Sequence, residues 1–386
     1  MAAFWFFVAL LSAGGALWLM QPTRIAPLAA VPAPAPTPDR HRSTVSFVGD
    51  VMLGGGVAEV ARRRGTDTLF ARVDPWLHAG DAVVGNLECV LSTRGAPTAS
   101  KPEAALRAHR EWLLRGSPED AAALARANFA AMTLANNHSM DYRGVAMDDS
   151  LAALHGAGIA STGAGDDLTR AQSPAIFERA GIRFAVLGVS EILPQGSWAT
   201  RGRSGVAPGR GLARTSLDPA FDGAMARRVR AWRDRVDVVV VYEHWGTELV
   251  GKPTDDQRAF AHAMIDAGAQ LVVGAHPHVL GPIENYRGGV IAYSLGNFVF
   301  DAYPGAAARS AILQVRFDGA RVAGWEAVPV VITGGIPHAA DERSARAIAR
   351  ALEVGPTCHD GLRMPGACVT TEGTRRAALH HSAHAD

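Results

Sequence analysis

Short apolar runs alternate with helix-like stretches along most of the chain. Eight runs are rich in Val, Ile and Phe and bounded by Gly or Asp, as buried strands are: TVSFVG, DAVVGN, FAAMTLA, RFAVLGVS, VDVVVVYE, AQLVVGA, GVIAYSLG and SAILQVRF. Between them, DDSLAALHGAG and TDDQRAFAHAMIDAGA carry apolar residues at helical spacing, and Thr254 and Gly268 mark the ends of the second helix. The pattern predicts an α/β fold whose strands are covered by helices on both faces.

The first residues follow a different pattern. No charged side chain precedes Arg24, and the apolar stretch is long enough to cross a hydrocarbon core of roughly 30 Å as a helix. Residues 1–23 are therefore predicted as a transmembrane anchor or a signal segment, and the lack of basic residues before the apolar run leaves both open. Residues 24–42 are rich in Pro and Ala, which predicts an extended linker without a core of its own.

Composition supports one sizeable folded region after this linker. The chain has 386 residues, 48% of them hydrophobic, which is enough to bury a large core. Its 38 basic and 37 acidic side chains give a net charge of +1, so no nucleic-acid partner is expected on electrostatic grounds. We predict a folded domain over residues 43–340 and a C-terminal extension over residues 341–386.

The three cysteines are not part of the predicted chemistry. Cys358 and Cys368 lie in the Gly/Pro-rich extension and would form a disulfide in an exported chain. Cys89 follows a predicted buried strand and is expected to pack. The tail ALHHSAHAD, although it contains three His, is expected to be a frayed terminus.

Polar side chains follow five of the predicted strands, at the point where the apolar part of each strand ends. They are Asp50; Asn86 and Glu88; Asn136, Asn137, His138 and Asp141; Glu243, His244 and Glu248; and His276 and His278. Each motif alone also fits a turn residue, a helix cap or a hydrogen-bonded core His. Because ligands of open α/β sheets bind at strand ends, the five together predict one convergent polar site.

The residue types at these strand ends favour a divalent metal. Asp50, Glu88 and the Asn137 carboxamide offer oxygen, and three imidazoles offer nitrogen, a mixture that suits Mn, Fe or Zn better than Mg or Ca. Six candidate ligands exceed what one tetrahedral ion needs, so one or two ions are expected, with Asp50 placed to bridge a pair.

Six segments also resemble a known family in order and spacing: GDVMLGG, GNLE, ANNHSMDYRG, EHWGTE, GAHPHV and YSLGNFVFD. They resemble the CapA group of poly-γ-glutamate and capsule biosynthesis proteins, which is similar to calcineurin-like metallophosphoesterases. The resemblance covers roughly Val45 to Asp301. It implies a four-layer α/β/β/α sandwich with the metal site at the strand ends, in an exported or membrane-anchored protein whose domain lies outside the cytoplasmic membrane.

The resemblance also implies a role for individual residues. Asp50 matches the first metal-binding Asp, and His138 matches the His that protonates the leaving oxygen or stabilises the transition state, so both count as catalytic. The implied metal ligands are Asp50, Glu88, Asn137, His244, His276 and His278, the last two holding separate ions. The supporting residues expected around them are Asn86, Asn136, Asp141, Glu248 and Asn297.

Two positions depart from the wider metallophosphoesterase pattern. The usual Asp-x-His reads Asp50, Val51, Met52, so one ligand of the first ion is missing. The usual Gly-Asp motif has Asn86 at the Asp position, with Glu88 two residues later. If Glu88 substitutes, two ions remain possible; if it does not, a single ion or none is expected.

A Gly/Arg-rich loop lies between two predicted strands. Arg201, Arg203, Arg210 and Arg214 would either close over an anionic substrate or form a solvated loop.

Two functional classes follow from these observations. One is a metal-dependent phosphoester hydrolase that acts on a phosphorylated substrate. The other is a component of capsule synthesis that binds or exports an acidic polymer beside other membrane proteins of that pathway. The intact Asn137–His138 pair favours the enzyme, since binding alone needs no acid, whereas Met52 favours the binding component.

Overall fold

A computed structural model describes residues 41–209, 219–301, 304–354 and 369–370 of the chain. The predicted anchor or signal segment, most of the linker, Arg210 and Arg214, Cys358 and Cys368, and the C-terminal tail lie outside the described residues. Across the described ranges, no helix is both long enough and apolar enough to span a membrane.

The larger sheet has nine strands in the order β18-β17-β16-β1-β2-β5-β6, with β15 beside β1 and β19 beside β17. β1, β2, β5, β6 and β15 run parallel, and β16 begins an antiparallel extension. The strands are β1 (Arg42–Val51), β2 (Ala82–Leu87), β5 (Phe129–Thr133), β6 (Ala160–Thr162), β15 (Asn297–Val299), β16 (Arg309–Asp318), β17 (Arg321–Thr333), β18 (Ile336–Ala339) and β19 (Val369–Thr370).

The smaller sheet has six strands in the order β13-β14-β12-β11-β9-β8. Its four central strands are parallel, and an antiparallel strand closes each edge. The strands are β8 (Ala175–Arg179), β9 (Ile182–Ser190), β11 (Val238–His244), β12 (Leu271–Ala275), β13 (Ile283–Tyr286) and β14 (Gly289–Ala292). Two further pairs are β3 (Val90–Leu91) with β4 (Arg115–Gly116), and β7 (Ala164–Gly165) with β10 (Gly205–Val206).

Helices occupy most of the longer connections between strands. They are α1 (Gly55–Arg64), α2 (Asp74–Leu77), α3 (Glu103–Arg107), α4 (Asp120–Arg126), α5 (Arg143–Gly156), α6 (Leu168–Ala171), α7 (Pro219–Arg233), α8 (Asp255–Asp266) and α9 (Glu342–Ala351). Short 3-10 turns occur at Thr66–Leu69 and Ala306–Ala308. The mixed α/β class predicted from the sequence is confirmed.

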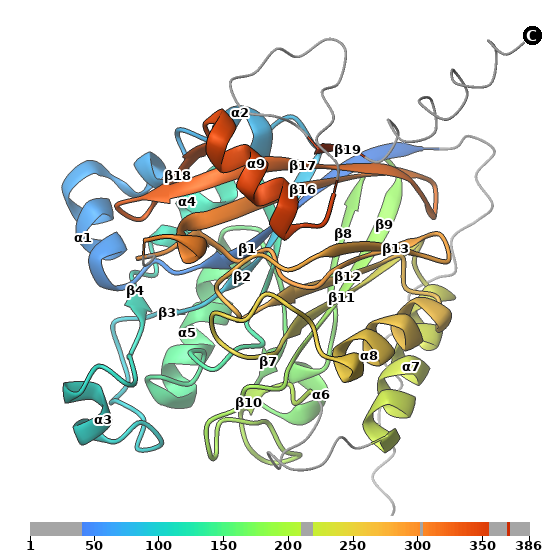
Figure 1. Ribbon diagram of the computed structural model, residues 1–386. Helices are drawn as coiled ribbons and strands as arrows, with labels where there is room; N and C mark the ends of the chain where they lie inside the picture. The colour runs from blue at the N-terminus through green and yellow to red at the C-terminus, as the bar shows by residue number, and fades with distance from the viewer. Residues whose placement is uncertain (1–40, 210–218, 302–303, 355–368, 371–386) are drawn as a thin grey trace, which may run out of the picture. The chain divides into compact units, whose positions relative to one another are not determined.

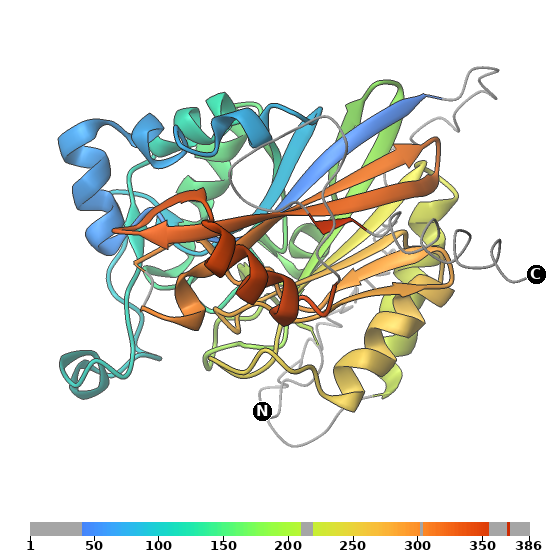
Figure 2. The ribbon, with the colours of Figure 1, turned by 45° about the horizontal axis from the view of Figure 1, so that its top comes forward.

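Three buried clusters set the order of the layers. In the first, Phe47 and Val84 of the larger sheet pack with Phe184 and Val240 of the smaller sheet, so the two sheets lie face to face. In the second, the outer face of the larger sheet packs against α2, α4 and α5 through Leu77, Leu124, Met147 and Leu154. In the third, Met225 of α7 and Phe260 of α8 cover the outer face of the smaller sheet. Figures 1 and 2 show these helices on opposite sides of the paired sheets.

The first helix of the predicted C-terminal extension, α9, belongs to the packed domain. Asp341 caps α9 by accepting a hydrogen bond from the Ser344 backbone N–H at 2.7 Å. Ala345 and Ile348 of this helix are buried in the cluster between the two sheets. The described core therefore continues past residue 340.

Candidate metal centre

The carboxyl ends of the parallel strands bring the predicted polar residues together. Asp50 at the end of β1 lies opposite Asn86 of β2, and His244 at the end of β11 lies opposite Ala275, the last residue of β12. Because the sheets pack face to face, acidic residues of the larger sheet meet imidazoles of the smaller one. The site therefore takes its side chains from both sheets.

Three groups of side chains are arranged so that their ligand atoms lie within 4.8 Å of one another. The first contains Glu88, His244 and His276, and the second contains Asp50, Glu88 and His278. Two groups that share one carboxylate are the arrangement expected of a bridged metal pair. The third group contains the exposed Glu248 with both of the closing His residues.

The residue common to the first two groups is Glu88, not Asp50. Asp50 groups with Glu88 and His278 alone, so the bridging role expected of Asp50 stays a prediction, with Glu88 as the carboxylate that the two groups share. Asp50 instead lies 3.3 Å from the His278 Nδ1 atom, and its second oxygen accepts a hydrogen bond from Asn86.

Two buried polar atoms at the centre of the site fit a divalent cation. Glu88 Oε1 and His276 Nδ1 are buried, and neither has a hydrogen-bond partner among the described residues. An unpaired buried acceptor costs about 1–3 kcal/mol, so two of them on residues of one ligand group favour a bound ligand at this place. A carboxylate oxygen and an imidazole nitrogen are donors that Mn, Fe or Zn would take.

Asn86 orders the two carboxylates. Its Nδ2 donates to Asp50 Oδ1 at 2.8 Å and to Glu88 Oε2 at 3.1 Å, and its Oδ1 accepts from Asn136 Nδ2 at 2.9 Å. Asn136 also donates to the Leu87 carbonyl at 2.8 Å, which fixes the carboxamide pair. The neutral amide at this position holds both acids while adding no third negative charge.

Burial and neighbouring charges shift the pKa values of the two carboxyl groups in opposite directions. Burial and the charge of Asp50 raise the pKa of Glu88 well above its usual value. Burial opposes ionisation of Asp50, but the hydrogen bond and charge of His278 outweigh it, and the pKa of Asp50 is lowered. For His278 itself, burial is outweighed by the hydrogen bond to Asp50, and its pKa is raised. These shifts favour the charged forms of Asp50 and His278 and the neutral form of Glu88.

The other two imidazoles are held neutral. Burial and then the neighbouring His278 lower the pKa of His276 to about 3. Burial, together with His276, lowers the pKa of His244 well below its ordinary value. Metal ligation requires neutral imidazoles, so both side chains are already in the protonation state that a cation would need.

His138 is oriented by a buried ion pair. Its Nδ1 lies 2.8 Å from Asp141 Oδ2, and its backbone N–H donates to Asn136 Oδ1 at 3.0 Å. The buried Lys101 ammonium pairs with Asp141, lies 3.1 Å from His138 Nδ1 and donates to the Trp112 carbonyl at 2.9 Å. With Nδ1 engaged, Nε2 is the ring atom that remains for a substrate. Lys101 was missed because no motif surrounds it, and a lone Lys in a loop usually lies in solvent.

The remaining predicted residues of the strand ends also join the site. Asn137 Oδ1 lies 2.8 Å from His244 Nε2, beside the first group of ligands. Asn297 Oδ1 lies 2.8 Å from His278 Nδ1, and its Nδ2 donates to the Ala307 carbonyl at 3.1 Å. Asn297 therefore orients one of the closing imidazoles.

Met52 and the arginine loop take no part in the ligand groups. Met52 is buried in the outer cluster of the larger sheet, and its sulfur accepts a hydrogen bond from the Gly54 backbone N–H at 3.0 Å. The exposed Arg203 donates to the Trp198 carbonyl at 3.1 Å, and its guanidinium lies over the Trp198 ring. Within the described part of the chain, Arg203 thus stabilises its own loop.

The closing motif has an unusual backbone. His276 and His278 have φ values of 92° and 57°, although neither is Gly. Positive φ costs a non-Gly residue of order 1–3 kcal/mol and is found where function demands it. The His276 N–H points to Asp50 Oδ2 at 3.4 Å, which ties the strained turn to the acidic half of the site.

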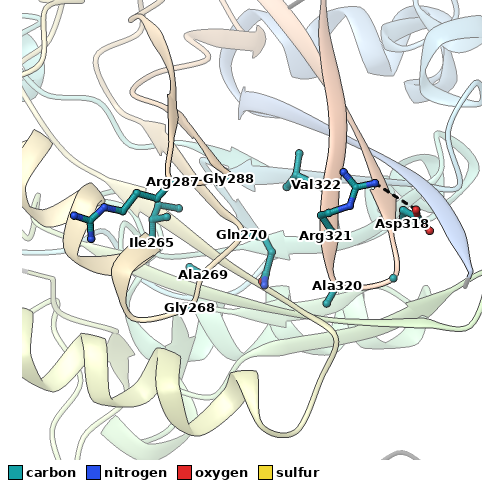
Figure 3. A pocket seen from close by; sticks show the side chains of 12 residues that line it. Ile265, Gly268, Ala269, Gln270, Arg287, Gly288, Asp318, Ala320, Arg321 and Val322 are labelled. Atoms are coloured by element: carbon teal, nitrogen blue, oxygen red, sulfur yellow. Dashed lines mark hydrogen bonds and ion pairs between the residues drawn. The ribbon is translucent and has the colours of Figure 1, made fainter. Parts of the chain in front are cut away.

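A cavity lies toward the opposite ends of the strands from the candidate site. It has a volume of about 610 Å³ and is lined by the β13–β14 and β16–β17 turns, with Arg321 donating to Asp318 at 3.4 Å (Figure 3). Asp318 pairs with Arg42 at the start of β1, whereas the candidate site lies at the end of that strand, roughly 26 Å away at 3.3 Å per residue. No candidate ligand lines this cavity.

Sequence comparisons with known proteins agree on one family. A family model described as "Bacterial capsule synthesis protein PGA_cap" matches residues 44–302. The PGA biosynthesis protein CapA of Bacillus subtilis is 35% identical over 76% of this chain and 73% of its own length. The capsule biosynthesis protein CapA of Bacillus anthracis is 33% identical over 79% of this chain and 71% of its own length. A hypothetical protein from Thermus thermophilus, of solved structure, is 18% identical and covers 77% of this chain and 96% of its own, with a TM-score of 0.40.

Proposed function

The chain belongs to the PGA_cap family of bacterial capsule synthesis proteins, and we propose that it serves capsule or poly-γ-glutamate synthesis as a metal-dependent phosphoester hydrolase. The proposal includes a relation to calcineurin-like metallophosphoesterases and a position of the domain outside the cytoplasmic membrane. The observation that carries it is the pair of ligand groups sharing Glu88, with His138 anchored beside them.

The residues divide into two metal positions in this proposal. Asp50, Glu88 and His278 would hold one ion, and Glu88, Asn137, His244 and His276 would hold the other. Bound divalent ions polarise a phosphoryl oxygen and lower the pKa of water, which supplies a nucleophile at neutral pH. Asn86 and Asn297 keep the ligands in place through the hydrogen bonds described above.

His138 supplies the proton in this mechanism. Asp141 and Lys101 engage Nδ1, so the Nε2–H of the ring donates to the leaving oxygen of the ester. The Asn136 carboxamide holds the His138 backbone and, through Asn86, the two carboxylates. One short network thus aligns the acid with both metal positions.

A second candidate function rests on Met52. Because a sulfur in the outer cluster replaces one His ligand, the first metal position has three protein side chains and would hold its ion more weakly. A single ion with neutral imidazoles around it would then serve as a clamp for the carboxylates of an acidic polymer. Such a protein would work with other capsule-synthesis membrane proteins without cleaving an ester.

The test separates metal binding from proton transfer. Purified full-length protein, loaded with Mn, Zn or Fe in turn, is analysed for bound metal and for turnover of an aryl phosphate. We expect His138→Ala to lower turnover by about two to four decades with metal content nearly intact, and Asp50→Ala to lose turnover together with the ion of its own ligand group. His155→Ala is the control, because His155 is exposed on α5.

Polymer production in cells distinguishes the hydrolase from the carboxylate clamp. If the wild type cleaves no phosphoester with any of these metals, and if a His138→Ala strain still makes polymer, the hydrolase proposal fails and the clamp replaces it. If the strain loses polymer and the purified variant keeps its metal, the hydrolase is supported.

A further inference from the structure

Two consecutive exposed apolar side chains directly follow Glu248, a member of one candidate ligand group. Among the described residues, the exposed large hydrophobic side chains are Trp112, Val145, Ile176, Leu249 and Val250. Leu249 and Val250 are consecutive, in the loop that joins β11 to α8, and are 61% and 47% exposed. Single exposed hydrophobic residues are ordinary on a protein surface, but a cluster beside a polar site is a feature of binding surfaces.

A backbone hydrogen bond ties Leu249 directly to the segment of the metal ligands. Its N–H donates to the carbonyl of Pro277, the residue between His276 and His278, at 2.8 Å. The preceding residue, Glu248, belongs to the ligand group of those two imidazoles. The Leu249 backbone therefore lies beside the segment of His276 and His278, and the side chains of Leu249 and Val250 are exposed there.

The Leu249 backbone is itself costly. It has a φ of 61°, a conformation in which a Leu side chain is strained by roughly 1–2 kcal/mol. A residue that is strained, apolar and exposed contributes nothing to the core, and Asn or Gly would fit this backbone better. A contact between the Leu249 side chain and a bound ligand would account for an exposed Leu at this position.

Trp112 lies beside the other reactive residue. It is 41% exposed, and its carbonyl accepts a hydrogen bond at 2.9 Å from Lys101, the ammonium that lies against His138. Phe300, half-buried, adds an aromatic ring whose centroid is 4.9 Å from that of His278. We call Trp112, Leu249 and Val250 the apolar rim.

From this rim we infer that the site takes an amphiphilic anion, an alkyl phosphate whose phosphoryl group lies at the metal ligands and whose chain lies on Leu249 and Val250. The inference rests on the proposed function and names its substrate class. The polar groups bind the charged end, while the rim removes methylene groups from water. Trp112 covers the chain on the His138 side.

Binding of two phosphonates, which cannot be hydrolysed at the P–C bond, tests the inference. The Mn-loaded full-length protein is titrated with methylphosphonate and with octylphosphonate in a calorimeter. We expect octylphosphonate to bind at least about tenfold more tightly, since a tenfold ratio requires the burial of about two methylene groups.

Substitutions in the apolar rim test whether its side chains cause the preference for octylphosphonate. In the double variant Leu249→Asn, Val250→Thr, the Asn tolerates the positive φ and the Thr keeps the β-branched shape. The ratio of octylphosphonate to methylphosphonate affinity should fall close to one. The affinity for methylphosphonate should stay unchanged. Trp112→Ser should lower the ratio about threefold. Ile176→Thr, on the exposed side of β8, is the matched control and should keep the wild-type ratio.

The outcomes separate this inference from the proposed function. If both phosphonates bind the wild type equally, or if the double variant keeps the preference, the amphiphilic substrate is excluded and the hydrolase proposal stands. If the Mn-loaded protein binds neither compound, both are overturned.

Discussion

At the scale of single residues, the site is built from groups whose charge depends on one another. His276 is buried next to His278, and this environment lowers its pKa to about 3. Because the folded value lies below the unfolded value of about 6.5, the native state binds fewer protons than the unfolded chain between these values. The contribution of His276 to stability is therefore present above pH 6.5 and lost as the pH falls toward 3.

This linkage gives a prediction for the metal-free protein. Between pH 7.5 and pH 5, protonation of the unfolded-state His276 should remove about 2 kcal/mol from the free energy of unfolding. His276→Gln should flatten that part of the pH dependence, as measured by urea denaturation at both pH values. His155→Gln, an exposed substitution on α5, should keep the wild-type difference, and an unchanged slope in His276→Gln would contradict the linkage.

The sequence pointed to most of these residues, because polar side chains follow the ends of apolar runs that form strands. It could not assign the bridge, since Asp50 and Glu88 are both carboxylates and their distances to the two imidazole groups depend on how the sheets pack. Nor could it find Lys101, which is buried only because Asp141, His138 and the Trp112 carbonyl surround it. Partners that come from distant segments leave no local signal.

At the scale of elements, helices and strands with a clear local sequence signal were predictable. The Thr254 cap of α8 is present as expected: Thr254 Oγ1 accepts from the Gln257 N–H at 3.2 Å, and Gln257 Oε1 accepts from the Thr254 N–H at 2.9 Å. β17 was not predicted, because Gly324 and Pro329 interrupt its apolar pattern and both residues usually argue against a strand. Its long pairing with β16 overrides that preference.

The cap gives a prediction at this scale. Thr254→Ala should lower the free energy of unfolding by about 1 kcal/mol, because the Gln257 N–H loses its acceptor. Thr254→Ser keeps the hydroxyl and should cost much less. Urea denaturation of the three proteins measures the difference, and equal losses in both variants would show that the methyl group, not the hydrogen bond, matters at this position.

At the scale of the whole molecule, the site depends on the packing of one sheet against the other. Tyr242 of β11 donates to the Val48 carbonyl of β1 at 2.6 Å, a hydrogen bond that crosses the interface just below the metal ligands. Tyr242→Phe should lower the free energy of unfolding by about 1–2 kcal/mol, since a buried carbonyl loses its partner. Tyr286→Phe, which removes a longer and exposed contact to Asp266, is the matched control and should cost little.

Metal binding should stabilise the whole fold for the same reason. Its ligands come from both sheets, so a cation binds the native packing and not the unfolded chain, and at a free concentration of one hundred times Kd it should add about 2.7 kcal/mol per site. A thermal denaturation series with Mn²⁺ measures this gain.

The Glu88→Gln variant distinguishes a site that holds two ions bridged by Glu88 from a site that holds one ion. Loss of the shared carboxylate should abolish nearly all of the Mn²⁺-dependent gain, because both ligand groups contain Glu88, whereas Asp50→Asn should retain the part due to Glu88, His244 and His276. Glu59→Gln on the exposed face of α1 should behave as wild type. Equal residual gains in Glu88→Gln and Asp50→Asn would instead mean that the two groups do not share a bridge, and that the site holds a single ion.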